Sequence, residues 1–353
     1  MIKVLVVDDS GFSRKVITKI LERIPDVQVA DTASDGQDAL KKTLRLRPDL
    51  ITLDLEMPNM DGFTFLRWVM NTMPTPVIVV SAQEADENVF KALDLGALDF
   101  VVKPTKHPSL ELEYIKADLI EKVLSVPLLR ESKTKEKMQV EELRIKESLM
   151  KGRPHQAPRV IGIASSTGGP PAIQAIIHDL PPNFPVPLLI AQHMPRSFTA
   201  LFAERLNKHT QLSVQEAAEG AFLERGNVYI APGGKHLLIH KSGDRLQIEL
   251  IEREDVRYQP SADLLFESMA NAAESRTIGT VLTGMGDDGS KGLKTIKGKG
   301  GITIAESERT AIIFGMPQEA IQTGMVDFVL SLQQVPLAFT TLCSSNATTD
   351  KHR

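Results

Sequence analysis

Residues 160–171 read VIGIASSTGGPP, and this stretch decides which kind of fold the second half of the chain adopts. The run of small and branched apolar residues at its start is typical of a buried strand. The hydroxyl residues and the glycine pair that follow at 165–169 indicate a tight turn into a helix. A strand-turn-helix of this composition can present a nucleophile, cradle a phosphate or simply reverse the chain.

The same alternation of apolar runs and amphipathic segments continues on both sides of this stretch, so we expect an α/β protein. Residues 2–104 predict a (βα)5 unit with a parallel, flavodoxin-like sheet, and the chain after 158 predicts a second, doubly wound α/β domain. Within the second domain, HLLIHKSGDRLQIEL at 236–250 predicts a β-hairpin around Ser-Gly-Asp. The expected strands lie at 2–7, 27–30, 50–55, 76–82, 99–104, 160–165, 187–192, 228–232, 277–284 and 301–307. The expected helices lie at 12–24, 36–46, 62–72, 87–97, 110–125, 170–180, 197–209, 261–275 and 290–298.

Length and composition agree with two soluble domains. The chain has 353 residues, of which 42% are apolar and 24% are charged. Residues 131–153 carry charges of both signs and no aromatic residue, which favours an exposed helical or flexible linker over a dedicated docking segment. We therefore predict a domain at 1–122, a linker at 123–157 and a domain at 158–345.

The composition also excludes several classes of partner. A net charge of −4 argues against nucleic-acid binding, which favours a basic domain. The sequence contains no apolar stretch of about 18 residues that would insert into a membrane, and its start lacks a signal-peptide pattern. We expect a monomer in the cytoplasm. The single cysteine, Cys343, forms no intrachain disulfide and is expected to be an inert thiol in a fraying tail.

Polar side chains stand at the ends of four expected strands in the first domain: Asp8, Asp9, Asp54, Ser81 and Lys103. Such ends face one crevice in a parallel sheet, where open α/β sheets bind ligands. Carboxylates gathered there resist ionising unless a cation is present, and oxygen-only ligands suit Mg²⁺. Asp54 can then attack a phosphoryl group while Lys103 and Ser81 receive its oxygens. A single aspartate of this kind is more often a helix cap, but capping does not easily explain the whole group.

Over residues 1–122 these motifs resemble the receiver domain of bacterial response regulators. The resemblance rests on the acidic pair at 8–9, on LDLEMPNMDG at 53–62 and on Lys103 before Pro104. It implies that Asp54 accepts a phosphoryl group and that Mg²⁺ is its cofactor. The implied metal ligands are Asp8 through water, Asp9, Asp54 and the backbone carbonyl of Glu56. The implied switch residues are Ser81, Phe100 and Lys103.

Alternatives for residues 160–171 differ in how well they fit the sequence. A P-loop needs a lysine where Pro170 stands, and the GxGxxG spacing of a dinucleotide loop is absent. A plain turn capped by Ser166 or Thr167 remains open when the stretch is taken alone. A nucleophilic serine needs a base, and the base needs an orienting carboxylate.

Two other expected strand ends supply these groups. His193 follows PLLIAQ, and GMGDDG at 284–289 contains Asp287 and Asp288. The glycines of that turn also let the N–H of Met285 approach a developing oxyanion. Metal hydrolysis is the competing chemistry, and no HExxH or paired cysteines support it.

Residues 158–335 resemble the catalytic domain of the chemotaxis protein-glutamate methylesterases, the CheB family. Further matching motifs are YIAPGGKH (229–236), RYQPSADLLF (257–266) and FGMPQEA (314–320). The resemblance implies Ser166 as nucleophile, His193 as base, Asp288 as acid and Met285 as oxyanion donor. Ser165 is then expected to hydrogen-bond near the imidazole, and Asp287 to be the variable position. Ala164 stands where the family often has glycine.

Together the two resemblances imply a phosphorylation-activated serine hydrolase that needs no cofactor for the ester reaction. Its substrates would be glutamate methyl esters on chemotaxis receptors, with glutamine deamidation as a second activity. A histidine kinase would supply the phosphoryl group, and the receiver would cover the active cleft until Asp54 is phosphorylated. The competing hypotheses are a DNA-binding response regulator and a catalytically idle module that docks on receptors.

Overall fold

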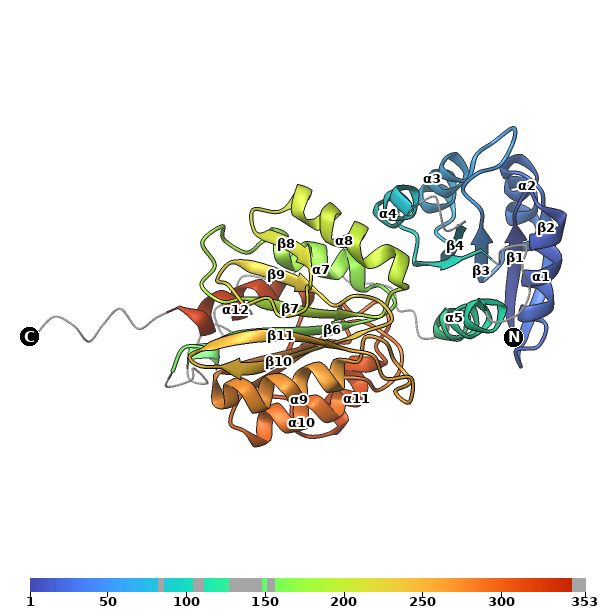
Figure 1. The fold of residues 1–353 in the computed structure, drawn as a ribbon. Coiled ribbons are helices and arrows are strands. Elements are labelled where there is room, and N and C mark those ends of the chain that lie inside the picture. The colour runs from blue at the N-terminus through green and yellow to red at the C-terminus, as the bar shows by residue number, and fades with distance from the viewer. Residues whose placement is uncertain (82–85, 104–110, 127–147, 151–155, 345–353) are drawn as a thin grey trace, which may run out of the picture. The chain divides into compact units, whose positions relative to one another are not determined.

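The computed structural model describes residues 1–81, 86–103, 111–126, 148–150 and 156–344, and the chain divides into the units Met1–Leu129 and Arg130–Arg353 (Figure 1). Of the expected linker at 123–157, residues 123–126, 148–150 and 156–157 are described, and the rest lies outside the described residues. The boundaries at 122 and 158 stay predictions. Among the described residues, no helix is both long enough and apolar enough to cross a bilayer.

The first unit contains a parallel five-stranded sheet in the order β2-β1-β3-β4-β5. This order is the flavodoxin-like one, as predicted. The strands are β1 (Ile2–Val7), β2 (Val27–Ala33), β3 (Leu50–Leu53), β4 (Val77–Ser81) and β5 (Asp99–Val102). The helices are α1 (Gly11–Leu21), α2 (Gly36–Leu46), α3 (Gly62–Thr72), α4 (Asp86–Asp94) and α5 (Glu111–Ser125). The helices α1, α2 and α3 each begin at a side-chain cap, provided by Ser10, Asp35 and Asp61.

The second unit is built on a parallel seven-stranded sheet in the order β14-β13-β12-β6-β7-β9-β8. Its strands are β6 (Val160–Ser165), β7 (Leu188–Gln192), β8 (Ser213–Glu216), β9 (Asn227–Ile230), β12 (Thr277–Val281), β13 (Ile302–Glu306) and β14 (Phe328–Leu330). A separate antiparallel hairpin, β10 (His236–Ser242) and β11 (Arg245–Ile251), confirms the predicted one. The helices are α7 (Gly169–His178), α8 (Arg196–His209), α9 (Ala262–Ala273), α10 (Ser290–Gly298), α11 (Met316–Gln322) and α12 (Val335–Cys343).

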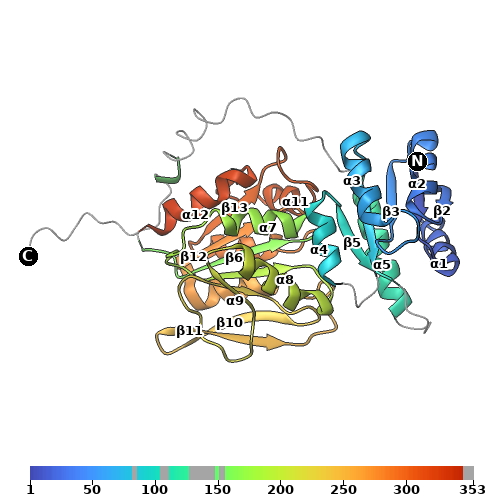
Figure 2. The ribbon, with the colours of Figure 1, turned by 90° about the horizontal axis from the view of Figure 1, so that it is seen from above.

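Helices cover both faces of the larger sheet, which explains why its central strands are apolar throughout. The helices α7 and α8 lie on one face, and α9 and α10 lie on the other, as Figures 1 and 2 show. Every residue of β6, β7 and β12 is buried. On the α9 side, the core also includes the inward residues of the hairpin, such as Leu237 and Ile248.

The order of strands in this sheet has a topological switch point beside β6. From β6 the chain first moves to β7 on one side, and later from β12 to β13 on the other side. The carboxyl ends of β6 and β12 therefore flank a topological switch point, where open α/β sheets bind their ligands. The turns after β6, β7 and β12 are the three that carry the expected triad residues.

Several elements of the second unit were not predicted. The strands β8 and β14 are short, lie at the two edges of the sheet and are only partly buried, so they carry no long apolar run. The helices α11 and α12 were also missed. The expectation that Cys343 lies in a fraying tail is wrong, because Cys343 is the last residue of α12 and is buried together with Phe339 and Leu342.

Candidate active site

The turn after β6 positions Ser166 at the start of α7. The N–H of Ser166 donates to the carbonyl of Thr283 at 3.1 Å, which ties this turn to the one after β12. Gly168 has a φ of +78°, a conformation that residues with a Cβ avoid, and it lets the chain enter α7 directly. The Ser166 side chain is thereby held near the positive end of the α7 dipole, where developing negative charge is favoured.

His193 lies beside Ser166 because their strands run in register. Ser165 pairs with Gln192 in the parallel β6–β7 ladder, and the N–H of His193 donates to the carbonyl of Ser165 at 3.0 Å. Ser166 and His193 therefore follow adjacent strand ends, and such neighbours are about 5 Å apart in a sheet. Among the described residues, no hydrogen bond links the Ser166 hydroxyl to His193. Catalytic hydrogen bonds are often formed fully only when substrate is bound.

The imidazole of His193 is oriented by Asp288. Its Nε2 lies 2.8 Å from Asp288 Oδ2, and a carboxylate at this position requires the proton on Nε2. The other nitrogen, Nδ1, is buried and has no hydrogen-bond partner among the described residues. In this tautomer Nδ1 carries a lone pair and is the nitrogen that can accept a proton from a serine. The ring also stacks on Tyr258, with centroids 4.6 Å apart and planes 4° from parallel.

Asp288 is held at the N-terminus of α9. Its carboxylate accepts hydrogen bonds from the N–H groups of Ala262 and Asp263, at 2.7 and 2.9 Å, and from the Ser261 hydroxyl at 3.1 Å. Burial by itself would raise the pKa of Asp288, but the hydrogen bonds from His193 and from the α9 backbone hold that pKa below its usual value. Asp288 is therefore ionised at neutral pH and can stabilise an imidazolium.

The turn after β12 also places Met285 and Asp287. Gly284 leaves no room for a side chain, since a Cβ there would lie 2.9 Å from the backbone N and from the Cβ of Ser166. Met285 thus follows a residue in direct contact with the nucleophile. Among the described residues, its N–H has no acceptor, as an oxyanion donor requires. Asp287 is exposed, whereas Asp288 is 3% exposed.

A buried amide connects the nucleophile turn to the histidine. Gln192 Nε2 donates to the carbonyls of Ser166 and His193, at 2.9 and 3.0 Å, and its Oε1 accepts from the Ser165 hydroxyl at 2.7 Å. The expected hydrogen bond of Ser165 near the imidazole is thus replaced by one to Gln192. Gly169 is required here, because a Cβ would lie 2.0 Å from Gln192 Oε1.

The first unit gathers the predicted acidic cluster. Ligand oxygens of Asp8, Asp9 and Asp54 all lie within 4.8 Å of one another. Lys103 forms ion pairs with Asp54 and with Asp8, the latter at 3.2 Å. Burial raises the pKa of Asp8 and raises that of Asp54 to about 6. With one lysine beside three carboxylates, the donor set suits a divalent cation such as Mg²⁺.

The remaining predicted receiver residues are placed as follows. The N–H of Glu56 lies 3.3 Å from Asp54 Oδ1, so Glu56 directly borders the acidic cluster. Ser81 ends β4, but its side chain lies outside the described part of the chain. Phe100 points into the core of the unit, where it contacts Phe90 edge-on and the ammonium of Lys122 lies 5.1 Å from its ring centre.

Comparison with known proteins identifies both units. A family model described as CheB methylesterase matches residues 161–339, which is just over half of the chain. This chain belongs to the CheB methylesterase family. A second model, the response regulator receiver domain, matches residues 4–114. The predicted fold class and family are therefore confirmed.

Relatives in the CheB methylesterase family match nearly the whole chain. A protein-glutamate methylesterase/protein-glutamine glutaminase of Geobacter sulfurreducens is 45% identical, covering 95% of each chain. One of Pyrococcus abyssi is 41% identical, covering 95% of this chain and 92% of its own. The crystal structure of the Thermotoga maritima CheB methylesterase catalytic domain is 38% identical with a TM-score of 0.52, and covers 53% of this chain and 100% of that one.

Sequence reasoning missed the residues that support the CheB-type triad. Gln192 was noticed only as the last residue of PLLIAQ before His193, and the N-terminal residues of α9 only as part of RYQPSADLLF. A signal did exist, since both motifs contain polar residues at the ends of apolar elements. Their partners lie about 25 residues or more away along the chain, so the bonds they form required the tertiary structure.

Proposed function

We propose that Ser166, His193 and Asp288 form the triad with which this chain hydrolyses glutamate methyl esters. The observation that carries the proposal is the 2.8 Å contact between His193 Nε2 and Asp288, which leaves the buried Nδ1 atom of the imidazole free to act as base. In the chymotrypsin arrangement the carboxylate binds Nδ1 and Nε2 is the base, whereas here the carboxylate binds Nε2 and Nδ1 is the base. The chemistry requires only that one nitrogen be oriented and the other be basic.

The reaction follows from these positions. Ser166 Oγ attacks the side-chain carbonyl of the ester while His193 Nδ1 accepts its proton, and the negative carbonyl oxygen is stabilised by the N–H of Met285. The imidazolium, stabilised by Asp288, returns the proton to the leaving methoxide, and methanol departs. Water, activated by the same nitrogen, then releases glutamate and restores Ser166.

Glutamine deamidation would use the same steps. The leaving group is then ammonia, which needs a proton even more than methoxide does, and His193 supplies it. We propose both activities, with chemotaxis receptors as substrates and sensory adaptation as the outcome. No step of the ester or amide reaction calls for a cofactor.

The receiver unit controls this hydrolase by phosphorylation, and we propose Asp54 as the acceptor, with a chemotaxis histidine kinase as donor. When Mg²⁺ is bound it neutralises charge on the transferring phosphoryl group. Asp8, Asp9, Asp54 and the backbone carbonyl of Glu56 would hold it, and Lys103 and Ser81 would contact the phosphoryl oxygens. Phe100 would respond to that contact as the switch aromatic. We further propose that the chain acts as a cytoplasmic monomer.

The competing hypotheses differ in their support. A DNA-binding output domain is wrong, since the output unit is a seven-stranded parallel sheet that the CheB methylesterase model matches. If the chain were an idle docking module, it would release no methanol from methylated receptors, so an activity measurement distinguishes this hypothesis from the hydrolase.

The test is methanol release from methylated receptor membranes by the wild type, Ser166→Ala and Ser165→Ala. Ser166→Ala should lose several orders of magnitude, because the covalent route is gone. Ser165→Ala should lose about tenfold or less, because its hydroxyl acts through Gln192 and not on the substrate. Equal losses would refute the assignment of the nucleophile, and an inactive wild type would support the docking module.

A further inference from the structure

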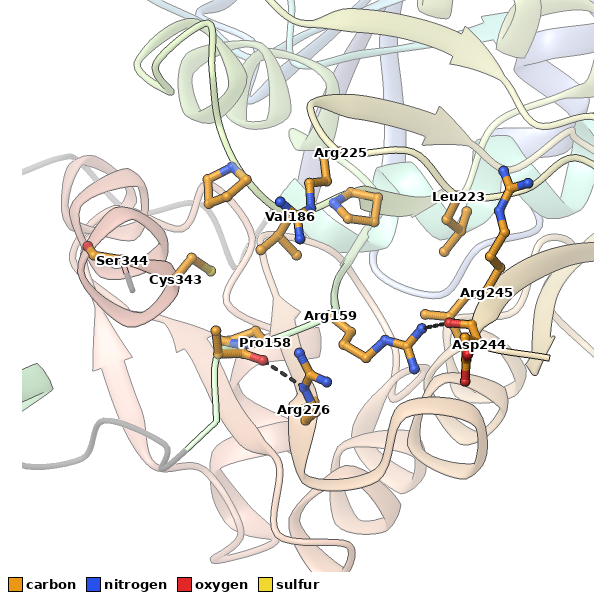
Figure 3. A pocket seen from close by; sticks show the side chains of 14 residues that line it. Pro158, Arg159, Val186, Leu223, Arg225, Asp244, Arg245, Arg276, Cys343 and Ser344 are labelled. Atoms are coloured by element: carbon orange, nitrogen blue, oxygen red, sulfur yellow. Dashed lines mark hydrogen bonds between the residues drawn. The ribbon is translucent and has the colours of Figure 1, made fainter. Parts of the chain in front are cut away.

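A second polar site lies where the strands of the larger sheet begin, at the end of the sheet opposite to the triad. A cavity of about 650 Å³ opens there, lined by residues that precede β6, β7, β9 and β12 (Figure 3). The triad residues follow the carboxyl ends of strands in the same sheet. Since β6 has six residues, and each adds about 3.3 Å, the two sites are separated by about 20 Å. The cavity therefore plays no part in the ester chemistry described above.

The cavity is strongly basic in a chain whose net charge is −4. Asp244 is the one carboxylate among its lining residues. Four arginines line the cavity: Arg159, Arg225, Arg245 and Arg276. None of these guanidinium groups forms an ion pair with a carboxylate among the described residues. The guanidinium of Arg245 lies over the ring of Phe222, 3.9 Å from its centre. The other three face the cavity, with Arg225 reaching towards Arg159 and Arg276 from across the opening (Figure 3).

Two of these arginines are held in place by the backbone. Arg159 donates to the carbonyl of Asp244, and Arg276 Nε donates to that of Ala157 at 2.9 Å. Each bond uses one of the five N–H groups of a guanidinium, so most donors remain for a ligand. Partial burial, and then the positive charge of Arg159, lower the pKa of Arg276. Arg159 and Arg276 form no ion pair among the described residues and repel each other, and a bound anion would reduce that repulsion.

The rest of the lining is largely apolar. Pro185, Val186 and Pro187 line the cavity just before β7, and Pro158 and Leu246 add to this surface. A cavity of this volume is within the range that holds small organic ligands, and it is far larger than a single inorganic anion needs. The planar fork of arginine matches phosphate oxygens two at a time.

We infer that this cavity binds a phosphorylated small molecule of nucleotide size. Its phosphate groups would lie between Arg159, Arg225 and Arg276. Its apolar body would pack against residues 185–187. The site is formed by the catalytic unit alone, so ligand binding would be independent of Asp54 and of the receiver.

The test is calorimetric titration of the full-length chain with ATP, inorganic pyrophosphate and inorganic phosphate. EDTA is present, so that the acidic cluster of the receiver holds no metal ion and does not attract phosphate. We expect saturable ATP binding, with inorganic phosphate at least about tenfold weaker, because it reaches neither all three arginines nor the apolar surface. ATP should also raise the melting temperature of the catalytic unit.

Arg225→Gln is the decisive variant, since the side chain of Arg225 is exposed and makes no hydrogen bond among the described residues. It should weaken ATP binding about tenfold or more and leave methanol release unchanged. Arg159→Gln/Arg276→Gln should weaken it further. The matched control, Lys294→Gln/Lys299→Gln, removes two exposed charges from the same unit and should leave binding within about twofold.

Each remaining outcome overturns the inference. If ATP does not bind, or binds equally well to wild type and Arg225→Gln, the cavity is not its site. If inorganic phosphate binds as tightly as ATP, the ligand is not of nucleotide size. If the lysine control weakens binding as much as the arginine variants do, the attraction comes from overall charge and not from this cavity.

Discussion

Asp288→Asn tests the triad sharply, because the Asp288 carboxylate accepts four hydrogen bonds, two on each oxygen. His193 Nε2 and the N–H of Ala262 lie at 2.8 and 2.7 Å from Oδ2. The Ser261 hydroxyl and the N–H of Asp263 lie at 3.1 and 2.9 Å from Oδ1. An imidazole can change tautomer and a hydroxyl can rotate, but a backbone N–H is always a donor. The new NH₂ group therefore faces a backbone donor in either orientation.

The size of the effect follows from this geometry. A buried donor without an acceptor lowers stability by about 1–3 kcal/mol. Loss of the negative charge at the start of α9 removes about 0.5–1 kcal/mol more. For a unit of this size, a total of about 2–4 kcal/mol lowers the melting temperature by about 5–15 °C. Turnover should fall by about 10³–10⁴-fold, because the imidazolium loses its counter-charge and one orientation favours the wrong tautomer.

The assay pairs thermal melts with methanol release at a temperature where the variant is folded. Asp287→Asn is the matched control: it makes the same chemical change at the exposed neighbouring residue, and both readouts should stay close to wild type. If Asp288→Asn melts like the wild type, the four-bond geometry is wrong. If it melts lower but keeps its turnover, Asp288 supports the fold and does not act in the triad.

Three further predictions concern regulation and pH. With Mg²⁺ and a small phosphodonor, wild-type turnover should rise while Asp54→Asn stays at its basal rate. Without a phosphodonor, the fragment 156–353 should turn over faster than the full-length chain, and equal rates would rule out inhibition by the receiver. Because burial raises the pKa of Asp54 to about 6, Mg²⁺ must displace a proton at lower pH, so calorimetry should show Mg²⁺ affinity falling about tenfold per pH unit below 6. Burial also raises the pKa of Glu306 from 4.5 to about 7, so the folded chain binds more protons than the unfolded chain between these values and stability falls as pH rises through that window. Glu306→Gln should remove this slope in denaturant unfolding of the catalytic unit, whereas the exposed Glu308→Gln should keep it.

The sequence alone determined the fold class and the residues proposed for the chemistry. Both follow from local patterns: apolar runs of strand length alternate with amphipathic helices, and polar residues stand where the runs end. In a parallel sheet these strand ends lie at the same end of the sheet, so the turns that contain Ser166, His193 and the Asp287-Asp288 pair could be grouped before their contacts were known. The resemblance to the CheB family then singled out Ser166 and Asp288. The edge strands β8 and β14 were missed because they lack such a pattern. They are short and half-buried, and leave no apolar run to recognise.

Only the tertiary structure decided how these residues are held. That the acid binds Nε2 of His193, and not Nδ1, depends on where the N-terminus of α9 meets the turn after β12, about 25 residues further along the chain. The bonds of Gln192 to the two neighbouring turns depend on β6 and β7 being adjacent and in register. The arginines of the cavity come from segments that the sheet brings together at the amino ends of its strands. Strand order and register arise from packing across the whole domain, so a local sequence pattern does not predict them.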